Sequence, residues 1–389
     1  MRIVDIRDIS VPLKGDIANA LVNFSEHNVS LVAVTTDVVR HGRPVTGLAF
    51  NSIGRFAQAG LLRERFVPRI LQADPQSLLD ASGRAFDPAA VHATAMRNEK
   101  PGGHGDRASA VAALELAIWD INAKLREEPA YATIARHIGH PLPTAPVPIY
   151  AAGGYYYPGD SLQRLRDEMR GYRDAGFRDF KIKIGGASLE EDLRRIEAAL
   201  DIADEGTHLA VDVNGRFDLA TALLYGQAIA PLGLRWYEEV GDPLDYGANA
   251  ELAKHYAGAI ATGENLFSSI DVQNLLRFAG MRPGKDVFQM EAGLSYGLTE
   301  YLKTIALMES NGFGRSQIHP HGGHLINLHI VTGLGLGGCE VYPGVFQPFG
   351  GYPVACMADE ARAFPTQAPG FGLEEKPELA PWINQLLAL

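Results

Sequence analysis

A set of charged side chains recurs at nearly constant spacing through the second half of the chain. Its members are Lys183, Asp212, Glu238, Glu264, Glu291 and His321, separated by 29, 26, 26, 27 and 30 residues. A buried carboxylate must be paired or must bind a metal, so convergence of these groups on one site explains the spacing most simply. Three carboxylates on adjacent strands would form an all-oxygen site with open positions, which suits Mg²⁺.

The spacing of 26–30 residues is the length of one strand, one helix and their loops. The pattern of apolar residues also predicts alternating strands and helices. From about residue 147, short apolar runs alternate with amphipathic segments such as 189–202 and 298–309. The runs expected to be strands are 147–151, 179–184, 209–213, 234–239, 259–262, 287–290, 316–319 and 339–342. Most precede a helix that can cover a parallel sheet. The pattern predicts an α/β fold with a (β/α)₈-type TIM barrel over 145–345, whose chemistry lies at the strand ends.

Alternation along each strand predicts which side chains enter the barrel. Lys181 and Lys183 share one face of their strand, and apolar residues occupy the other, so both lysines are expected to point inward. Two buried ammonium groups require balancing charges. Asp212 shares a face with Asn214. The pattern does not choose between Glu238 and its neighbour Glu239, because Trp236 and Tyr237 suit either face.

The N-terminal part has a different pattern of apolar and polar residues. Alternating segments such as 30–36 are mixed with helix-like segments such as 57–66, which is typical of an α+β unit. Within 109–125, apolar residues three and four apart predict a helix packed on a core. Glu127, Glu128 and Pro129 end that helix.

Histidines offer another interpretation of the site. His319, His321, His324 and His329 crowd one stretch, and a His-x-His pair on a barrel strand could bind zinc. That arrangement needs the pair on the first strand, where this chain has Tyr155, Tyr156 and Tyr157. At least two of the four histidines are expected to be structural, packing or capping the helix that begins near His324. The glycine-rich segment 333–338 lies between a helix and a strand, the wrong order for a phosphate loop.

Composition narrows the class of protein. Lys and Arg number 35 against 46 Asp and Glu, a net charge of −11, and no basic run could follow a phosphate backbone. The chain has no signal-like N-terminus and no long apolar stretch. We therefore expect a cytoplasmic protein without nucleic-acid or membrane partners. Its two cysteines, Cys339 and Cys356, are expected to be small buried residues.

Taken together, these motifs resemble the enolase superfamily and, within it, the mandelate racemase subgroup. The resemblance covers nearly the whole chain. It rests on the helix 112–121, the Lys181-Ile-Lys183 pair, Asp212 in Val-Asp-Val-Asn-Gly-Arg, Glu238 in Trp-Tyr-Glu-Glu, Glu264 in Thr-Gly-Glu-Asn, and the segments 98–105, 151–158, 320–324 and 346–351. It implies an α+β capping domain over 1–125, completed by 350–389, beside the barrel.

The resemblance also implies roles for individual residues. Asp212, Glu238 and Glu264 would hold one Mg²⁺ per subunit. Lys183 would remove the proton α to a substrate carboxylate, with its pKa lowered by Lys181 and the metal. His321 would donate the proton needed to lose a β-hydroxyl, and Mg²⁺ with cationic donors would stabilise the enediolate.

Further residues are expected around the substrate. Lys181 would help bind the substrate carboxylate, and Asn214, Asn19 and Lys100 would contact other parts of the molecule. Glu340 would either bind a substrate carboxylate as the protonated acid or pair with a nearby cation.

The chain departs from the subgroup at Glu291. The subgroup has aspartate at this position to orient the histidine, and the additional methylene changes the expected geometry of His321.

The resemblance implies a Mg²⁺-dependent acid-sugar dehydratase, a carbon–oxygen hydro-lyase. Through the segments 98–105, 151–158, 320–324 and 346–351 it also implies the leading expected substrate, D-tartrate, which would become oxaloacetate. Another acid-sugar dehydratase, or a racemase or epimerase using Lys183 and His321 from opposite faces, is the alternative. A non-catalytic ligand-binding module is a remote one, because such a module has no reason to bury these charges. The protein is expected to form a homo-oligomer.

Overall fold

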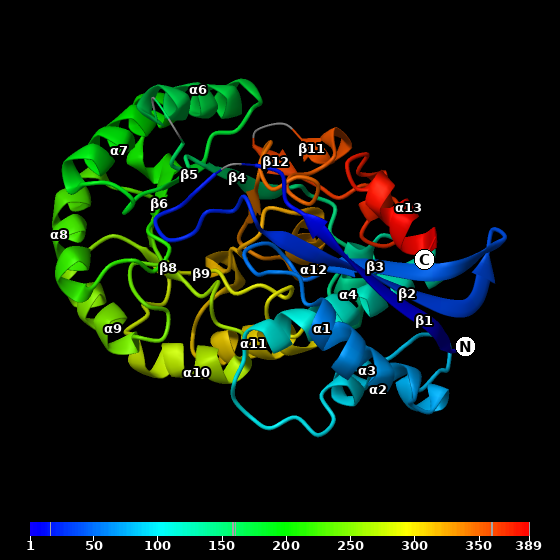
Figure 1. Ribbon diagram of the computed structural model, residues 1–389. Coiled ribbons are helices and arrows are strands. Elements are labelled where there is room, and N and C mark those ends of the chain that lie inside the picture. The colour runs from blue at the N-terminus through cyan, green and yellow to red at the C-terminus, as the bar shows by residue number, and fades with distance from the viewer. Residues whose placement is uncertain (16, 158, 160, 359–360, 389) are drawn as a thin grey trace.

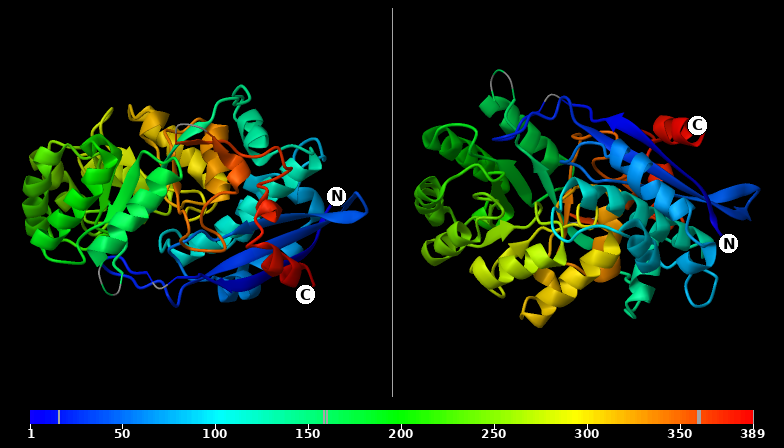
Figure 2. Two further views of the ribbon diagram at one scale, coloured as in Figure 1. Left: turned by 90° about the horizontal axis from the view of Figure 1, so that it is seen from above. Right: turned by 60° about the horizontal axis from the view of Figure 1, so that its bottom comes forward.

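The computed structural model describes residues 1–15, 17–157, 159, 161–358 and 361–388. Pro158, in the motif 151–158, and Leu389, at the end of the expected capping segment, lie outside these residues. The chain forms a barrel wrapped by helices and a smaller unit built on a three-stranded sheet (Figure 1). Both views in Figure 2 place β1–β3 on the side of the molecule opposite α8. The fold is therefore the predicted barrel with an N-terminal α+β unit.

The smaller unit combines an antiparallel sheet with helices that cover one of its faces. Its sheet has the order β1 (Ile3–Pro12), β2 (Asn28–Arg40) and β3 (Arg43–Phe50). Its helical segments are α1 (Ala59–Leu61), a π-helical stretch (Leu62–Phe66), α2 (Val67–Leu71), a 3₁₀ turn (Pro75–Leu78), α3 (Pro88–Ala95), α4 (Asp106–Leu125) and α5 (Ala130–His137). Helix α4 packs closely on β3, where a Cβ at Gly47 would lie 2.1 Å from the Ala117 carbonyl oxygen. Only glycine permits this approach.

Parallel strands form the barrel, each hydrogen-bonded to the next in sequence through β9. They are β4 (Val147–Gly153), β5 (Phe180–Lys183), β6 (Leu209–Asp212), β7 (Tyr237–Glu238), β8 (Ile260–Thr262), β9 (Val287–Phe288) and β10 (Cys339–Val341), which pairs with β4. The covering helices are α6 (Ser161–Asp174), α7 (Leu189–Ala203), α8 (Leu219–Ile229), α9 (Tyr246–His255), α10 (Ser269–Phe278), α11 (Leu298–Ser310) and α12 (Leu325–Leu334). Short 3₁₀ turns lie at Gly206–His208, Ala230–Leu232 and Arg315–Gln317.

The expected strand at 316–319 is wrong. Its first residues form the 3₁₀ turn Arg315–Gln317, and pairing with β9 is limited to one bridge between Phe288 and Ile318. The backbone N–H groups of His319 and His321 still donate to the carbonyls of Phe288, in β9, and of Gln289, the residue after it. Successive N–H groups of an extended chain face opposite sides, so Pro320, which has none, removes a donor on the side away from β9. The Gly337 N–H donates to the Ile318 carbonyl at 3.0 Å, which joins this segment to the chain entering β10.

The C-terminal segment contacts both units. It contains the 3₁₀ turns Val354–Cys356 and Leu373–Glu375, the strands β11 (Met357–Ala358) and β12 (Arg362–Ala363), and helix α13 (Ala380–Ala388). Strand β12 pairs with β4, whereas α13 packs on β1 and β2 (Figure 1). The buried Lys376 ammonium donates to the carbonyls of Gly350 and Gly351 at 2.8 and 3.0 Å. The exact domain boundaries remain predictions.

A buried carboxylate joins the two units. Glu115 on α4 accepts hydrogen bonds from the backbone N–H groups of Leu298 and Thr299, at 2.8 and 2.9 Å, and from the Trp119 indole at 2.9 Å. These N–H groups belong to the first turn of α11, which lacks intrahelical acceptors there. Burial raises the pKa of Glu115, and the donors oppose that effect.

Replacing Glu115 with alanine is expected to lower the free energy of unfolding by about 2–4 kcal/mol, because buried donors lose their acceptor. Urea unfolding measures the change. Glu64→Ala, at an exposed position, is the matched control. Equal midpoints for the two variants would contradict the assigned role of Glu115.

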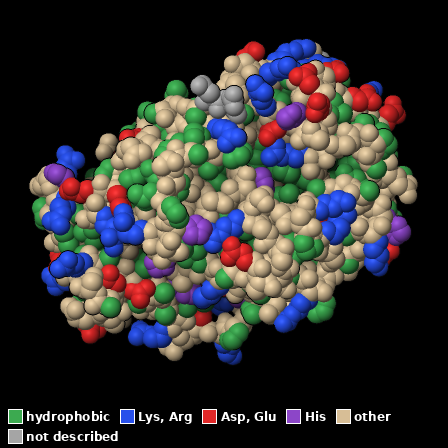
Figure 3. Space-filling model, turned by 180° about the vertical axis from the view of Figure 1, so that it is seen from behind, with side chains coloured by type: hydrophobic (Ala, Val, Ile, Leu, Met, Phe, Trp, Pro, Cys, Tyr) green, Lys and Arg blue, Asp and Glu red, His purple; other side chains and the backbone are tan. Residues whose placement is uncertain are grey.

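The surface carries mixed charge. Figure 3 shows Lys and Arg interspersed with Asp and Glu over the face seen from behind. Cys339 and Cys356 are both buried and free, as predicted. Within the described ranges, we find no helix with the length and apolar character needed to cross a membrane.

Candidate active site

Three carboxylates meet at one end of the barrel. Asp212 and Glu238 are paired residues at the ends of β6 and β7, and Glu264 follows β8 two residues beyond its end. One oxygen from each lies within 4.8 Å of the others. Glu264 Oε2 is buried and has no hydrogen-bond partner among the described residues. Three converging acids with an unsatisfied oxygen are suited to a hard divalent cation such as Mg²⁺.

The structure shows which of the adjacent residues Glu238 and Glu239 belongs to the carboxylate site, a choice that alternation along the strand could not make. Glu238 points into the barrel, where the Trp236 indole donates to its Oε2 at 2.7 Å. Glu239 adopts a left-handed backbone conformation with φ of 41°. Its Oε1 instead accepts a hydrogen bond from the Asn265 side-chain amide at 2.6 Å. Only Glu238 therefore joins Asp212 and Glu264.

Lys181 lies beneath the site, fully enclosed by acids. Its Nζ is 2.5 Å from Glu238, 2.7 Å from Glu340 and 3.5 Å from Asp212. Burial opposes the charged form, but these carboxylates raise the pKa of Lys181 well above its usual value. Glu340 pairs with a cation, the second of its two expected roles, and its pKa is lowered. Neither Lys181 nor Glu340 lines the cavity beside the carboxylates, and contact of either residue with substrate stays a prediction.

Lys183, unlike Lys181, lines the cavity. Its Nζ lies 2.5 Å from Asp212 Oδ2 and 5.4 Å from the centre of the Tyr155 ring. Burial and the repulsion of Lys181 lower the pKa of Lys183, but attraction to Asp212, Glu264 and Glu238 together outweighs them, so the net pKa is raised. Lys181 lowers the pKa as expected, but the carboxylates around Lys183, whose closeness the sequence does not disclose, raise it more. The lowered pKa expected with Mg²⁺ bound stays a prediction.

His321 lies in the segment after α11, and its side chain lines the same cavity as Lys183. Its Nδ1 is 2.9 Å from Glu291 Oε2, and its Nε2 lies 3.1 Å from the Tyr342 hydroxyl and 3.8 Å from Glu264. Burial would lower the pKa of His321, but Glu264 and Glu291 raise it to about 10. The histidine is therefore an imidazolium near neutral pH. Glu291 reaches the ring despite its additional methylene, and the histidines hold the pKa of Glu291 at about 2 against the effect of burial.

A cavity of about 240 Å³ connects these groups with the N-terminal unit. From the barrel it is lined by Tyr155, Lys183, Asn214, Glu239, Glu264, Asn265, His321, Tyr342 and Phe346, and from the cap by Asn19, Leu21, Val22, Phe24, Ile53, Gly54 and Arg55. Of the expected substrate contacts, Asn19 and Asn214 line it. Lys100 does not, because its side chain is exposed on the loop before α4.

The remaining histidines are structural. His324 caps α12, as predicted, by accepting from the Asn327 backbone N–H. His319 and His329 are buried, and desolvation lowers the pKa of each to about 3. Within the part of the chain that is described, the group of three or more His, Cys, Asp or Glu that could hold a metal is the carboxylate trio. The histidines therefore form no zinc site there.

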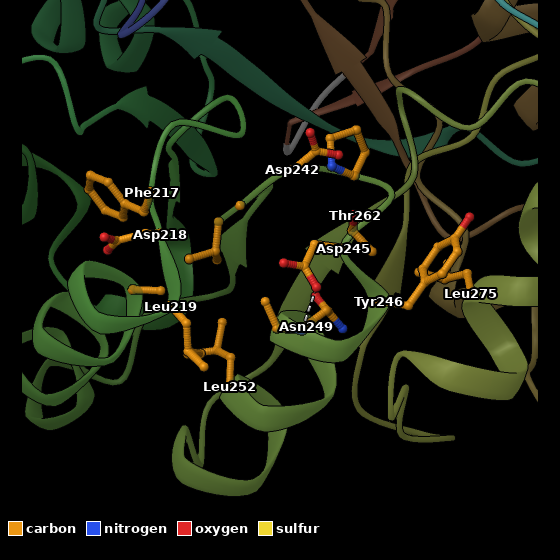
Figure 4. Close-up of a pocket in the computed structure, with 15 residues that line it drawn as sticks. Phe217, Asp218, Leu219, Asp242, Asp245, Tyr246, Asn249, Leu252, Thr262 and Leu275 are labelled. Carbon is orange, nitrogen blue, oxygen red and sulfur yellow. Dashed lines mark hydrogen bonds between the residues drawn. The ribbon is translucent and has the colours of Figure 1, made fainter.

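A second hollow lies between α8 and α9 on the outside of the barrel (Figure 4). Three aspartates line it, but each holds a local turn. Asp218 accepts from the Thr221 N–H at 2.8 Å, Asp242 from the Leu244 N–H at 2.9 Å, and Asp245 from the Ala248 N–H at 2.9 Å. Its volume of about 30 Å³ holds no more than a few waters.

The fold and site define a barrel protein with a carboxylate metal site at its strand ends. Residues 164–379 match the model of the enolase C-terminal domain-like family, and the chain belongs to that family. This confirms the predicted relationship to the enolase superfamily.

Two curated relatives are each less than 30% identical to this chain. The chain is 28% identical to arabinonate dehydratase of Saccharolobus solfataricus over 236 residues, 60% of each chain. It is 27% identical to L-talarate/galactarate dehydratase of Salmonella typhimurium over 229 residues, 59% of this chain and 54% of the relative. The chain thus spans little more than half the length of these curated relatives.

Solved structures support the fold over most of the chain. A racemase from Streptomyces coelicolor with bound magnesium has a TM-score of 0.75 at 21% identity and covers 98% of both chains. The Salmonella typhimurium dehydratase with Mg and L-lyxarohydroxamate also has a TM-score of 0.75 at 21% identity, covering 94% of this chain and 88% of its own.

Proposed function

We propose that this protein is a Mg²⁺-dependent dehydratase of acid sugars, with D-tartrate as the first substrate to test and oxaloacetate as its product. The observation that carries the proposal is the placement of Lys183 and His321 on one cavity beside the carboxylate trio. The dehydratases among the relatives support the reaction class.

The first requirement is to remove a weakly acidic proton. Asp212, Glu238 and Glu264 would hold Mg²⁺, which supplies positive charge where the substrate carboxylate gains negative charge. Lys183 takes the α-proton at Nζ. It must first lose its own proton and its ion pair with Asp212. Lys181 stays beneath, where it offsets the negative charge of Glu238 and Glu340.

The second requirement is to release the β-hydroxyl as water. The imidazolium of His321 donates its Nε2 proton to the leaving oxygen, while Glu291 holds Nδ1 and thereby orients the ring. The product is an enol that tautomerises to a 2-keto acid. The buried apolar side chains Phe24 and Ile53 of the N-terminal unit limit water around the reacting groups.

A racemase or epimerase is the second candidate, because Lys183 and His321 both line the cavity and could exchange an α-proton between faces. Cycloisomerases also occur among the relatives, including 3,6-anhydro-α-L-galactonate cycloisomerase of Streptomyces coelicolor. A substrate without a suitably placed β-hydroxyl could undergo only exchange.

A panel of acid sugars tests the proposal. The purified protein is incubated in D₂O with Mg²⁺ and D-, L- or meso-tartrate, galactarate or arabinonate. Keto acid is measured chemically and deuterium uptake by NMR. We expect keto acid from at least one diacid, loss of activity with EDTA, and recovery on addition of Mg²⁺. Deuterium uptake without keto acid across the panel would reject dehydration in favour of racemisation.

A further inference from the structure

Arg55 is a cation of the cap that contacts the barrel beside the metal site. Its guanidinium donates a hydrogen bond to Asn265 Oδ1 and lies 4.8 Å from the centre of the Phe267 ring. It is half-buried and lines the cavity. Among the residues that the structure describes, no carboxylate lies within ion-pair distance of Arg55. A neutral amide and an aromatic face therefore hold this charge.

Arg55, on the acceptor side, and two acidic side chains, on the donor side, together determine which way the Asn265 amide faces. Because Oδ1 accepts from Arg55, the Nδ2 group is directed toward Glu239 Oε1 at 2.6 Å and Glu264 Oε1 at 3.5 Å. A side-chain amide has one donor end and one acceptor end. The reversed orientation would place the NH₂ group against the guanidinium of Arg55 and the amide oxygen against Glu264, and both contacts are repulsive.

Asn265 and Glu239 each follow a member of the carboxylate trio. Glu239 follows Glu238 on β7, and Asn265 follows Glu264 after β8. The hydrogen bond between Asn265 and Glu239 therefore links the residue after Glu264 to the residue after Glu238. It restricts how far Glu264 can move away from Glu238.

We propose that Arg55 is a positioning residue for the metal site, acting through the orientation of Asn265 on the placement of Glu264. The inference rests on the proposed Mg²⁺ site. In this relay from Arg55 through Asn265 to Glu264, the first residue belongs to the N-terminal unit and the last is a proposed metal ligand. Packing of the N-terminal unit on the barrel and affinity for the metal therefore depend on each other.

Isothermal calorimetry with Mg²⁺ alone, without any acid sugar, tests the inference. Groups that orient metal ligands typically change metal affinity by about 10–100-fold when removed. We expect a Kd increase in this range for Arg55→Met, which keeps the apolar stem, and for Asn265→Ala. The double variant should bind no more weakly than the weaker single variant, and Arg55→Lys should restore part of the affinity. Arg43→Ala, exposed in β3, is the control and should match the wild type.

The outcomes separate this inference from the proposed function. If the wild type binds Mg²⁺ and Arg55→Met binds it equally well, the relay is wrong while the metal site stands. A raised KM with unchanged Mg²⁺ affinity would make Arg55 a substrate contact and also overturn the relay. If the losses of Mg²⁺ affinity in the two single variants added up in the double variant, Arg55 and Asn265 would act independently, and the relay would again be wrong. If the wild type does not bind Mg²⁺, both proposals fail. Thermal unfolding of Arg55→Met, Arg55→Lys and Asn265→Ala shows whether folded protein is compared.

Discussion

Lys183→Ala is expected to lose both α-proton exchange and keto-acid formation, each by about 10²–10⁴-fold, the usual contribution of a general base. Both reactions require the proton that Nζ removes. In the structure Lys183 is the amine that lines the cavity, whereas Lys181 is held below by Glu238 and Glu340. The measurements are deuterium uptake by NMR and keto-acid release, on whichever acid sugar the panel selects.

Two controls accompany Lys183→Ala. Lys285→Ala removes an exposed lysine and should leave both rates unchanged. Mg²⁺ binding to Lys183→Ala should persist, because Asp212 loses only its ion-pair partner. Retention of rapid exchange in a variant that still binds Mg²⁺ would exclude Lys183 as the base.

His321→Asn is expected to separate the two halves of the reaction. Keto-acid formation should fall by about 10²–10⁴-fold, because the leaving hydroxyl loses its proton donor. Exchange at the α-carbon should continue, because Lys183 and the carboxylate trio are unchanged. Asparagine retains a polar group near Glu291 but has no proton to release in this pH range.

His41→Asn is the matched control for His321→Asn. His41 is exposed and has φ of 50°, a conformation that asparagine tolerates. Loss of exchange together with dehydration in His321→Asn would mean that the histidine takes part in proton removal, as a racemase of two bases requires. Unchanged keto-acid formation would remove His321 from the mechanism.

Much of this arrangement could be predicted from spacing and alternation. The interval between Asp212, Glu238 and Glu264 reflects one strand and one helix, which the barrel repeats. Lys181 and Lys183 share a face of β5, and the structure buries both. Alternation could not choose between Glu238 and Glu239, because β7 is two residues long and the backbone leaves extended geometry at Glu239.

Other features depend on contacts between distant segments. Lys100 is turned outward because its neighbour Glu99 is buried by Arg65, Arg69 and Arg107. Arg55 meets Asn265 across 210 residues, and no spacing in the sequence marks either one. Pro320, just after the expected strand 316–319, was a local signal that pairing on one side of this segment would be incomplete, because it removes a backbone donor.

The position of α13 has a consequence for how the chain is made. This helix packs on β1 and β2, and the Arg7 side chain donates to the Leu387 carbonyl at 3.2 Å. Ribosomes add about 5–20 residues each second, so the earliest strands leave the exit tunnel roughly tens of seconds before the helix that covers them. Over that interval the surface of β1 and β2 that α13 covers stays open to solvent, so packing of α13 is a late step in folding.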